Sequence, residues 1–95
     1  MNGLFVGLMT LDCIYQAPRP PQANEKLVAE TAMMAAGGPA TNAAVAFAAL
    51  GGKATVMAAV GQHPVTALLK EDMAQMGVSI YDLTPKRQEP PPVSS

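Results

Sequence analysis

The sequence predicts an α/β domain with a mostly parallel sheet, because three short apolar runs alternate with two helical segments along 95 residues. The order strand, helix, strand, helix, strand is typical of parallel sheets, in which the crossover between neighbouring strands usually contains a helix. Glycine and proline mark the boundaries between these segments, as they do at helix ends. A chain of this length holds at most one domain.

The three expected strands are residues 3–9 (GLFVGLM), 54–60 (ATVMAAV) and 78–81 (VSIY). Each run is short and apolar and is bounded by glycine or polar residues, which favours a buried strand. Residues 11–15 continue in an extended pattern after the first run. Residues 25–34 (EKLVAETAMM) fit the period of a helix as well as that of a strand, so the pattern alone leaves that segment open.

Two helices are expected, at residues 39–50 and 64–76. The first begins with Pro39, whose missing N–H is not needed in the first turn, and it is apolar nearly all round, as buried helices are. The second is amphipathic, with most of its charged side chains away from an apolar face. That face comprises Val65, Leu68, Leu69, Met73 and Met76.

The last residues differ in composition from the rest of the chain. Residues 85–95 (PKRQEPPPVSS) are rich in proline and polar side chains. Such a segment cannot bury enough apolar surface to order itself, so we expect it to be disordered in isolation. The folded part would then span residues 1–84.

The composition restricts the classes of function. Hydrophobic residues make up 49% of the chain and charged residues only 14%, with a net charge of −1. Soluble domains usually carry about a quarter of charged residues, so we expect part of this surface to be covered by more chain or by a partner. No basic cluster is interleaved with aromatic residues, which argues against nucleic-acid binding.

No membrane or secretory segment is predicted. Residues 31–52 carry no charge, but the Gly-Gly-Pro sequence at 37–39 interrupts them, and alanine dominates where a membrane span would use larger apolar residues. The N-terminus lacks the basic region of a signal peptide. The single Cys13 cannot form an internal disulfide, and no metal-ligand spacing surrounds it. We therefore expect a cytoplasmic protein with no metal site and no membrane partner.

The stretch AAGGPATN at residues 35–42 is the candidate binding element. Gly37 and Gly38 directly precede the first helix, and glycine allows the backbone to approach a ligand closely. The free N–H groups of the first helical turn point to the same place. Asn42 offers a donor and an acceptor on one side chain, as sugar hydroxyls require. Asp12 follows the first expected strand at the edge where open α/β sheets bind ligands, so we expect these four residues to converge.

Three segments together resemble the N-terminal part of the ribokinase, or PfkB, family of sugar kinases: GLMTLDCIY, NEKLVAE and AAGGPATNAAVAFAALGGKATVMAAVG. The resemblance extends from residue 3 to about residue 83. It implies a partial ribokinase-like fold, with a central sheet, flanking helices and a small β lid over the sugar. Residues 11–15 and 25–34 would contribute to that lid, so the resemblance assigns the ambiguous segment to strands.

The resemblance also implies roles for individual residues. In the family, residues at the places of Asp12 and Asn42 bind sugar hydroxyls, and Gly37 and Gly38 line the same pocket. Thr10 stands where ribokinases often have Asn, within reach of that pocket. ATP and Mg²⁺ are the implied cofactors, but the Gly-Ala-Gly-Asp element with the catalytic base has no counterpart here, and neither has the ATP site. We therefore expect no catalytic residue in this chain.

Two functions remain open from the sequence. The first is the sugar-binding part of an ATP-dependent carbohydrate kinase, with a sugar or sugar-like small molecule as ligand. The second is a catalytically inactive fragment or interaction module, which would associate as a homodimer or through an open sheet edge. The loop at residues 61–64 (GQHP) departs from the family pattern, which has an acidic residue after Val-Gly, so its contribution is undetermined. A dinucleotide-binding half-domain is disfavoured because no G-x-G-x-x-G motif follows a strand.

Overall fold

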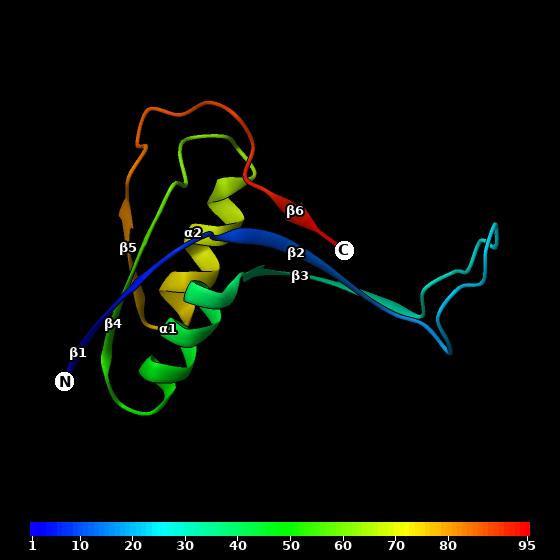
Figure 1. Cartoon of the computed structure of the whole chain (residues 1–95), viewed down its shortest axis with the longest axis horizontal. Coiled ribbons are helices and arrows are strands. Elements are labelled where there is room, and N and C mark those ends of the chain that lie inside the picture. The colour runs from blue at the N-terminus through cyan, green and yellow to red at the C-terminus, as the bar shows by residue number, and fades with distance from the viewer.

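The computed structural model describes all 95 residues, which form six strands and two helices (Figure 1). They are arranged as two small sheets and a pair of helices. In chain order the elements are β1 (Asn2–Val6), β2 (Thr10–Gln16), β3 (Thr31–Gly37), α1 (Pro39–Ala49), β4 (Lys53–Ala58), α2 (Thr66–Gln75), β5 (Val78–Asp82) and β6 (Val93–Ser94).

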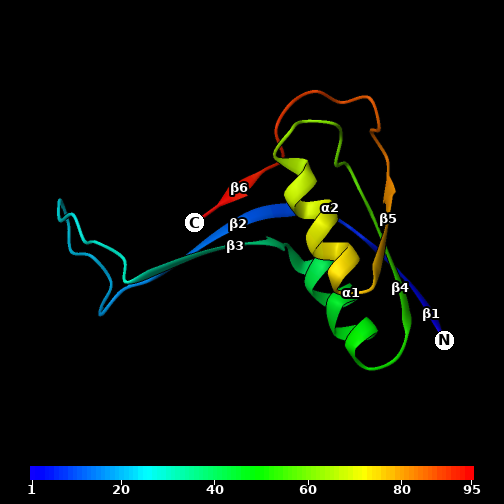
Figure 2. The same ribbon diagram turned by 180° about the vertical axis from the view of Figure 1, so that it is seen from behind.

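The first sheet is parallel and has the strand order β1-β4-β5. Thr55 in the central strand pairs with Leu4 on one side and with Ser79 on the other. Both helices lie against one face of this sheet (Figure 2). Residues therefore alternate along β4, with Ala54, Val56 and Ala58 buried against the helices and the residues between them less buried.

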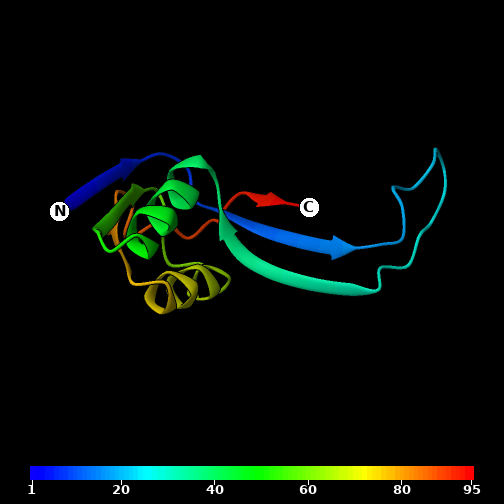
Figure 3. The same ribbon diagram turned by 90° about the horizontal axis from the view of Figure 1, so that it is seen from below.

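The second sheet has the order β3-β2-β6. Its strands β2 and β3 pair antiparallel over their whole length and form a long ribbon that projects from the body of the molecule (Figure 3). At the far end of this β2–β3 ribbon, Arg19 forms a two-pronged ion pair with Glu25. That pair lowers the pKa of Glu25 and raises the pKa of Arg19, because each charge stabilises the other.

The core lies between the first sheet and the helices, and it contains ten buried apolar residues. Val56, Leu69 and Met73 are among its largest fully buried side chains. Phe5 of β1 meets Phe47 of α1 edge to face, with ring centroids 5.4 Å apart. Most core residues are small, so the core is thin, as the scarcity of aromatic residues predicts.

The expected fold class is confirmed, and the four elements from α1 to β5 begin and end within two residues of their expected positions. The expectation for the first strand was wrong, because β1 ends at Val6 and the chain then turns into a separate strand, β2. Glycine at position 7 and the exposed Leu8 belong to this connection and not to a buried strand.

The ambiguous segment 25–34 is only partly strand. β3 begins at Thr31, while residues 25–29 take no regular secondary structure and carry the chain back from the tip of the ribbon. The resemblance therefore assigned the extended character correctly but placed it too early. In the last residues, where the sequence predicts disorder, Val93 and Ser94 pair in parallel with Leu11 and Asp12 of β2.

The helix α1 is not buried all round, contrary to expectation. Thr41 and Ala44 are buried, whereas Ala43, Ala46 and Ala49 are exposed. The reason is that only one side of α1 has elements packed against it. The outer face of the first sheet is equally open, with Leu4, Val6 and Tyr81 each more than half exposed. This open surface accounts for the low fraction of charged residues.

Candidate functional site

The candidate site lies where the β2–β3 ribbon joins the body. Thr10 and Asp12 lie on one face of β2, and in the strand register Thr10 stands opposite Gly37 and Asp12 opposite Ala35. The hydroxyl of Thr10 donates a hydrogen bond to Oδ1 of Asp12 at 2.6 Å. The other carboxylate oxygen, Oδ2, occupies the space that a Cβ on Gly37 would fill.

Gly38 joins the ribbon to the helix α1. Its φ of 98° lies in the region that only glycine adopts without strain, and a Cβ there would come 2.5 Å from the carbonyl oxygen of Leu8. The carbonyl of Gly38 accepts the N–H of Asn42 at 2.9 Å, which begins the helix. The buried Thr41 donates its hydroxyl to the same Leu8 carbonyl at 3.4 Å. The two connections β1–β2 and β3–α1 are therefore held together beside the site.

The structure brings together three of the five expected site residues directly, namely Thr10, Asp12 and Gly37. Gly38 is adjacent through the chain. Asn42 lies in the first turn of α1 with its side chain exposed, and its amide makes no hydrogen bond to the Thr10–Asp12 pair. An exposed amide in this place is free to meet a ligand.

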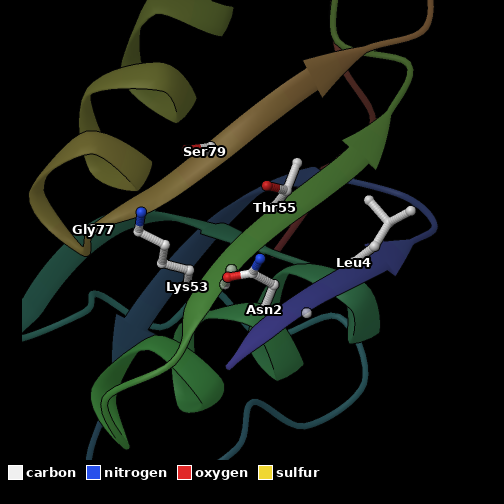
Figure 4. A pocket seen from close by; sticks show the side chains of 8 residues that line it. Asn2, Leu4, Lys53, Thr55, Gly77 and Ser79 are labelled. Carbon is white, nitrogen blue, oxygen red and sulfur yellow. The ribbon is translucent and has the colours of Figure 1, made fainter.

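A hollow of about 1120 Å³ runs from Asp12 along β2 toward the tip of the ribbon. Asp12, Cys13 and Tyr15 line it from β2, and Ser94 lines it from β6. A second hollow, of about 580 Å³, lies on the outer face of the first sheet, where Leu4 and Lys53 flank it (Figure 4). That second hollow is at the amino ends of the strands, whereas open α/β sheets bind ligands at the carboxyl ends. We regard the first hollow as the candidate because Asp12 lines it, although the other four expected site residues do not.

Two acidic residues that the sequence did not single out bind backbone N–H groups, one of them next to the site. Asp72 of α2 accepts the N–H of Ala36, next to Gly37, at 2.8 Å. Asp82 at the end of β5 accepts the N–H groups of Val60 at 3.0 Å and Gly61 at 2.9 Å. The position of Asp82 directly after an apolar strand was the one available signal, since side chains there lie at the ligand-binding edge.

The carboxylate of Asp82 anchors the GQHP loop that departs from the family pattern. Partial burial acts to raise the pKa of Asp82, but the N–H groups of Val60, Thr84 and Gly61 and the charge of Lys70 together lower it below its ordinary value. On the same loop His63 accepts the N–H of Val65 through Nδ1 at 3.1 Å. Both side chains are engaged in holding the loop.

The residues of this chain do not fit a metal centre. No group of three His, Cys, Asp or Glu side chains lies close enough together to hold a metal ion. Neither helix has the length and apolar character needed to cross a membrane.

A model of the pfkB family of carbohydrate kinases matches residues 3–94. The chain belongs to this family. No curated protein matches it. Among solved structures, a protein from Agrobacterium tumefaciens provisionally described as a ribokinase is 25% identical over 85% of this chain, with a TM-score of 0.78. Phosphofructokinase-2 from Escherichia coli in complex with fructose-6-phosphate is 22% identical over 98% of it, also at 0.78.

A nucleoside kinase from Methanocaldococcus jannaschii is a third structural neighbour of this PfkB-family chain, with 23% identity over 97% of it and a TM-score of 0.69. These likenesses confirm the ribokinase-like fold of the chain. The chain spans only 28%, 29% and 31% of the three neighbours' own lengths.

Proposed function

We propose that this chain is the N-terminal, sugar-binding portion of an ATP-dependent carbohydrate kinase. Membership of the PfkB family supports the class of reaction. The observation that carries the proposal is the Asp12 carboxylate, which packs into the space left by the missing side chain of Gly37 and is oriented by Thr10. A carboxylate fixed in this way is built to accept hydrogen bonds from the hydroxyl groups of a sugar.

Each residue of the site has a distinct part in this proposal. Asp12 accepts sugar hydroxyls, and Thr10 restrains its rotation, which lowers the entropy lost on binding. Gly37 and Gly38 keep the floor of the site free of side chains, and the exposed amide of Asn42 supplies a donor and an acceptor. ATP, when bound by a complete kinase, supplies the phosphoryl group, and the residues of this chain hold and orient the accepting sugar.

Sugar titration of the 95-residue chain tests the proposal. We would follow the backbone amides of Thr10 and Gly37 by NMR while adding D-ribose or fructose 6-phosphate, for the wild type and for Asp12→Asn. The amide side chain is isosteric but replaces one acceptor oxygen by a donor, so we expect at least about a tenfold loss of affinity. Equal affinities would show that Asp12 is not a sugar ligand. Glu71→Gln, an exposed change on α2, is the matched control for the lost charge.

An interaction module without catalysis is the second candidate function. It is supported by the open edges of β1 and β5, which have no neighbouring strand, and by the exposed apolar residues Leu4, Val6 and Tyr81 beside them. Association would occur as a homodimer or with a partner that adds to the sheet. Sedimentation of the purified chain over a range of concentrations distinguishes a monomer from an associating species.

In either function we expect a cytoplasmic location, because Cys13 is half-buried and unpaired.

A further inference from the structure

We propose that Asp72 of α2 is a positioning residue for the candidate site, because its carboxylate holds β3 in the place where Gly37 meets Asp12. The proposal rests on the proposed function, since the site that Asp72 positions is the proposed sugar site. Asp72 forms no hydrogen bond to Asp12 and does not line the hollow beside it, so its effect passes through the backbone of β3.

On the outer edge of β3, Asp72 accepts a hydrogen bond that a neighbouring strand would otherwise accept. Ala36 and Leu11 are register partners in the β2–β3 ribbon. The N–H of Leu11 points away from β3 and binds the carbonyl of Pro92 at 2.8 Å, so the N–H of Ala36 at the same level points away from β2. β3 is the outer strand of its sheet, and Oδ2 of Asp72 accepts that N–H at 2.8 Å. The carboxylate therefore satisfies the one backbone donor that β3 presents to α2 at this level.

The hydrogen bond between Ala36 and Asp72 lies next to the candidate site. Ala36 directly precedes Gly37, whose missing Cβ makes room for Oδ2 of Asp12. A shift of Ala36 away from α2 would carry Gly37 with it. The space that receives the Asp12 carboxylate would then change, although no residue of the site itself had been altered.

Apolar packing and the Asp72 hydrogen bond together hold the ribbon against α2. A small cavity of about 210 Å³ lies between them, lined by Leu11 and Met34 on the ribbon and by Leu68 and Asp72 on the helix. Leu11 is buried in the same core as Leu69 and Met73 of α2, whereas Leu68 is 46% exposed and Met34 is 62% exposed. A hydrogen bond to an ionised carboxylate is short and directional, so it adds to this packing a constraint on the position of Ala36 itself.

The neighbouring residue provides a matched control. Glu71 carries the same charge, lines the same cavity, is exposed, and makes no hydrogen bond to the ribbon. The substitution Glu71→Gln therefore removes one negative charge from α2 without removing the tether. Asp72→Ala removes both, and Asp72→Asn keeps an acceptor oxygen but loses the charge.

Amide hydrogen exchange of the full 95-residue chain tests the tether without any sugar. We expect the Ala36 amide to exchange about tenfold faster in Asp72→Ala than in Glu71→Gln, and by a smaller factor in Asp72→Asn. We also expect the chemical shift of the Asp12 carboxyl carbon to move in Asp72→Ala and to stay unchanged in Glu71→Gln. If Asp72→Ala does not fold, the same comparison is made between Asp72→Asn and Glu71→Gln. If the Ala36 amide of the folded Asp72 variant exchanges at the same rate as in Glu71→Gln, the proposal is wrong.

The affinity for sugar provides a second test of the proposal. With D-ribose and fructose 6-phosphate as probes, we expect Asp72→Ala to bind about tenfold more weakly than Glu71→Gln. Unchanged affinity together with faster exchange at Ala36 would mean that the tether does not position the site, which overturns the proposal. If the wild type itself binds neither sugar, the proposed function fails. The Ala36 exchange and the Asp12 carboxyl shift then still decide whether Asp72 positions β3.

Discussion

The carboxylate of Asp12 occupies the space in which a side chain on Gly37 would begin. A Cβ built on Gly37 collides with Oδ2 of Asp12, while Oδ1 of the same carboxylate accepts the hydroxyl of Thr10. The backbone at Gly37 does not need a positive φ, so glycine is required there for space and not for conformation. The two residues lie on adjacent strands that are far apart in sequence, and together they fix one acidic group at the base of the ribbon.

Gly37→Ala is expected to displace the Asp12 carboxylate and to weaken sugar binding about tenfold or more, because the new methyl group takes its place. Crowding at this buried position should also cost about 1–3 kcal/mol of stability. Titration with sugar and thermal unfolding measure the two effects. Gly77→Ala is the control, since Gly77 has open space around it and a φ of 72°, so only backbone strain is added. A loss of affinity as large in Gly77→Ala would mean that destabilisation, not the lost space, causes the effect.

Thr10→Val should reduce sugar affinity by about threefold to tenfold with less than about 1.5 kcal/mol of change in stability, because it removes one side-chain hydrogen bond and preserves the shape. The physical reason is that Asp12 then keeps its packing against Gly37 but loses the hydrogen bond that orients its carboxylate, so the ligand must order it further. Thr31→Val is the control: its hydroxyl also donates to a side chain, that of Gln16 at 3.2 Å, but at the exposed end of the same ribbon. Isothermal calorimetry with matched sugar concentrations separates the two variants. Similar affinities in both would contradict the orienting role of Thr10.

Local signals in the sequence were sufficient to predict α1, β4, α2 and β5. Pro39 and the glycines at positions 51 and 52 bound the first helix, and apolar periodicity identifies the second. The ribbon was harder, because residues 25–34 carry no clear period. β3 is stabilised by pairing with β2 across a long connection, which is a tertiary effect that propensity does not record.

The same distinction applies to the site. Gly37, Gly38 and Asp12 could be named from the sequence because glycines before a helix and an acid after an apolar run are local patterns. Their predicted setting was wrong in one respect: Asp12 lies within β2 and not at the end of the first strand. Asp72 could not have been found, since it acts on Ala36 from 36 positions away and is one of two adjacent acids on an amphipathic helix.

The Asp82 carboxylate should make the stability of the chain depend on pH below the ordinary range of carboxyl titration. Its pKa is lowered in the folded chain from an ordinary value of 3.8, so its contribution is fully present above that value. The contribution is lost as the pH falls through the lowered pKa of the folded state. Asp82→Asn should therefore be less stable than the wild type at neutral pH, by about 1–3 kcal/mol from its weakened hydrogen bonds.

Unfolding by urea at several pH values between neutrality and strong acid measures this dependence. We expect the wild type and Asp82→Asn to converge in stability as the solution is acidified, because protonation removes the negative charge and one of the two acceptor oxygens, which the substitution already lacks. Glu71→Gln should run parallel to the wild type over the whole range. A constant difference between the wild type and Asp82→Asn down to strong acid would show that Asp82 does not titrate in the expected direction.

The open face of the first sheet should govern self-association. Val6 on β1 is 63% exposed on this face, and Tyr81 on β5 is 59% exposed. Val6→Glu places a charge on that apolar surface, at the end of the edge strand β1. It should weaken any association through this surface by about tenfold or more, because a buried unpaired carboxylate would be strongly destabilising. The fold should persist, since the side chain at this position faces away from the helices. Leu50→Glu is the control, because Leu50 is 89% exposed at the end of α1 and is not part of the sheet.

Sedimentation equilibrium of the three chains measures the dissociation constants. A wild type that stays monomeric at high concentration would remove the support for the interaction module, whereas association abolished equally by both charges would point to net charge and not to the sheet face.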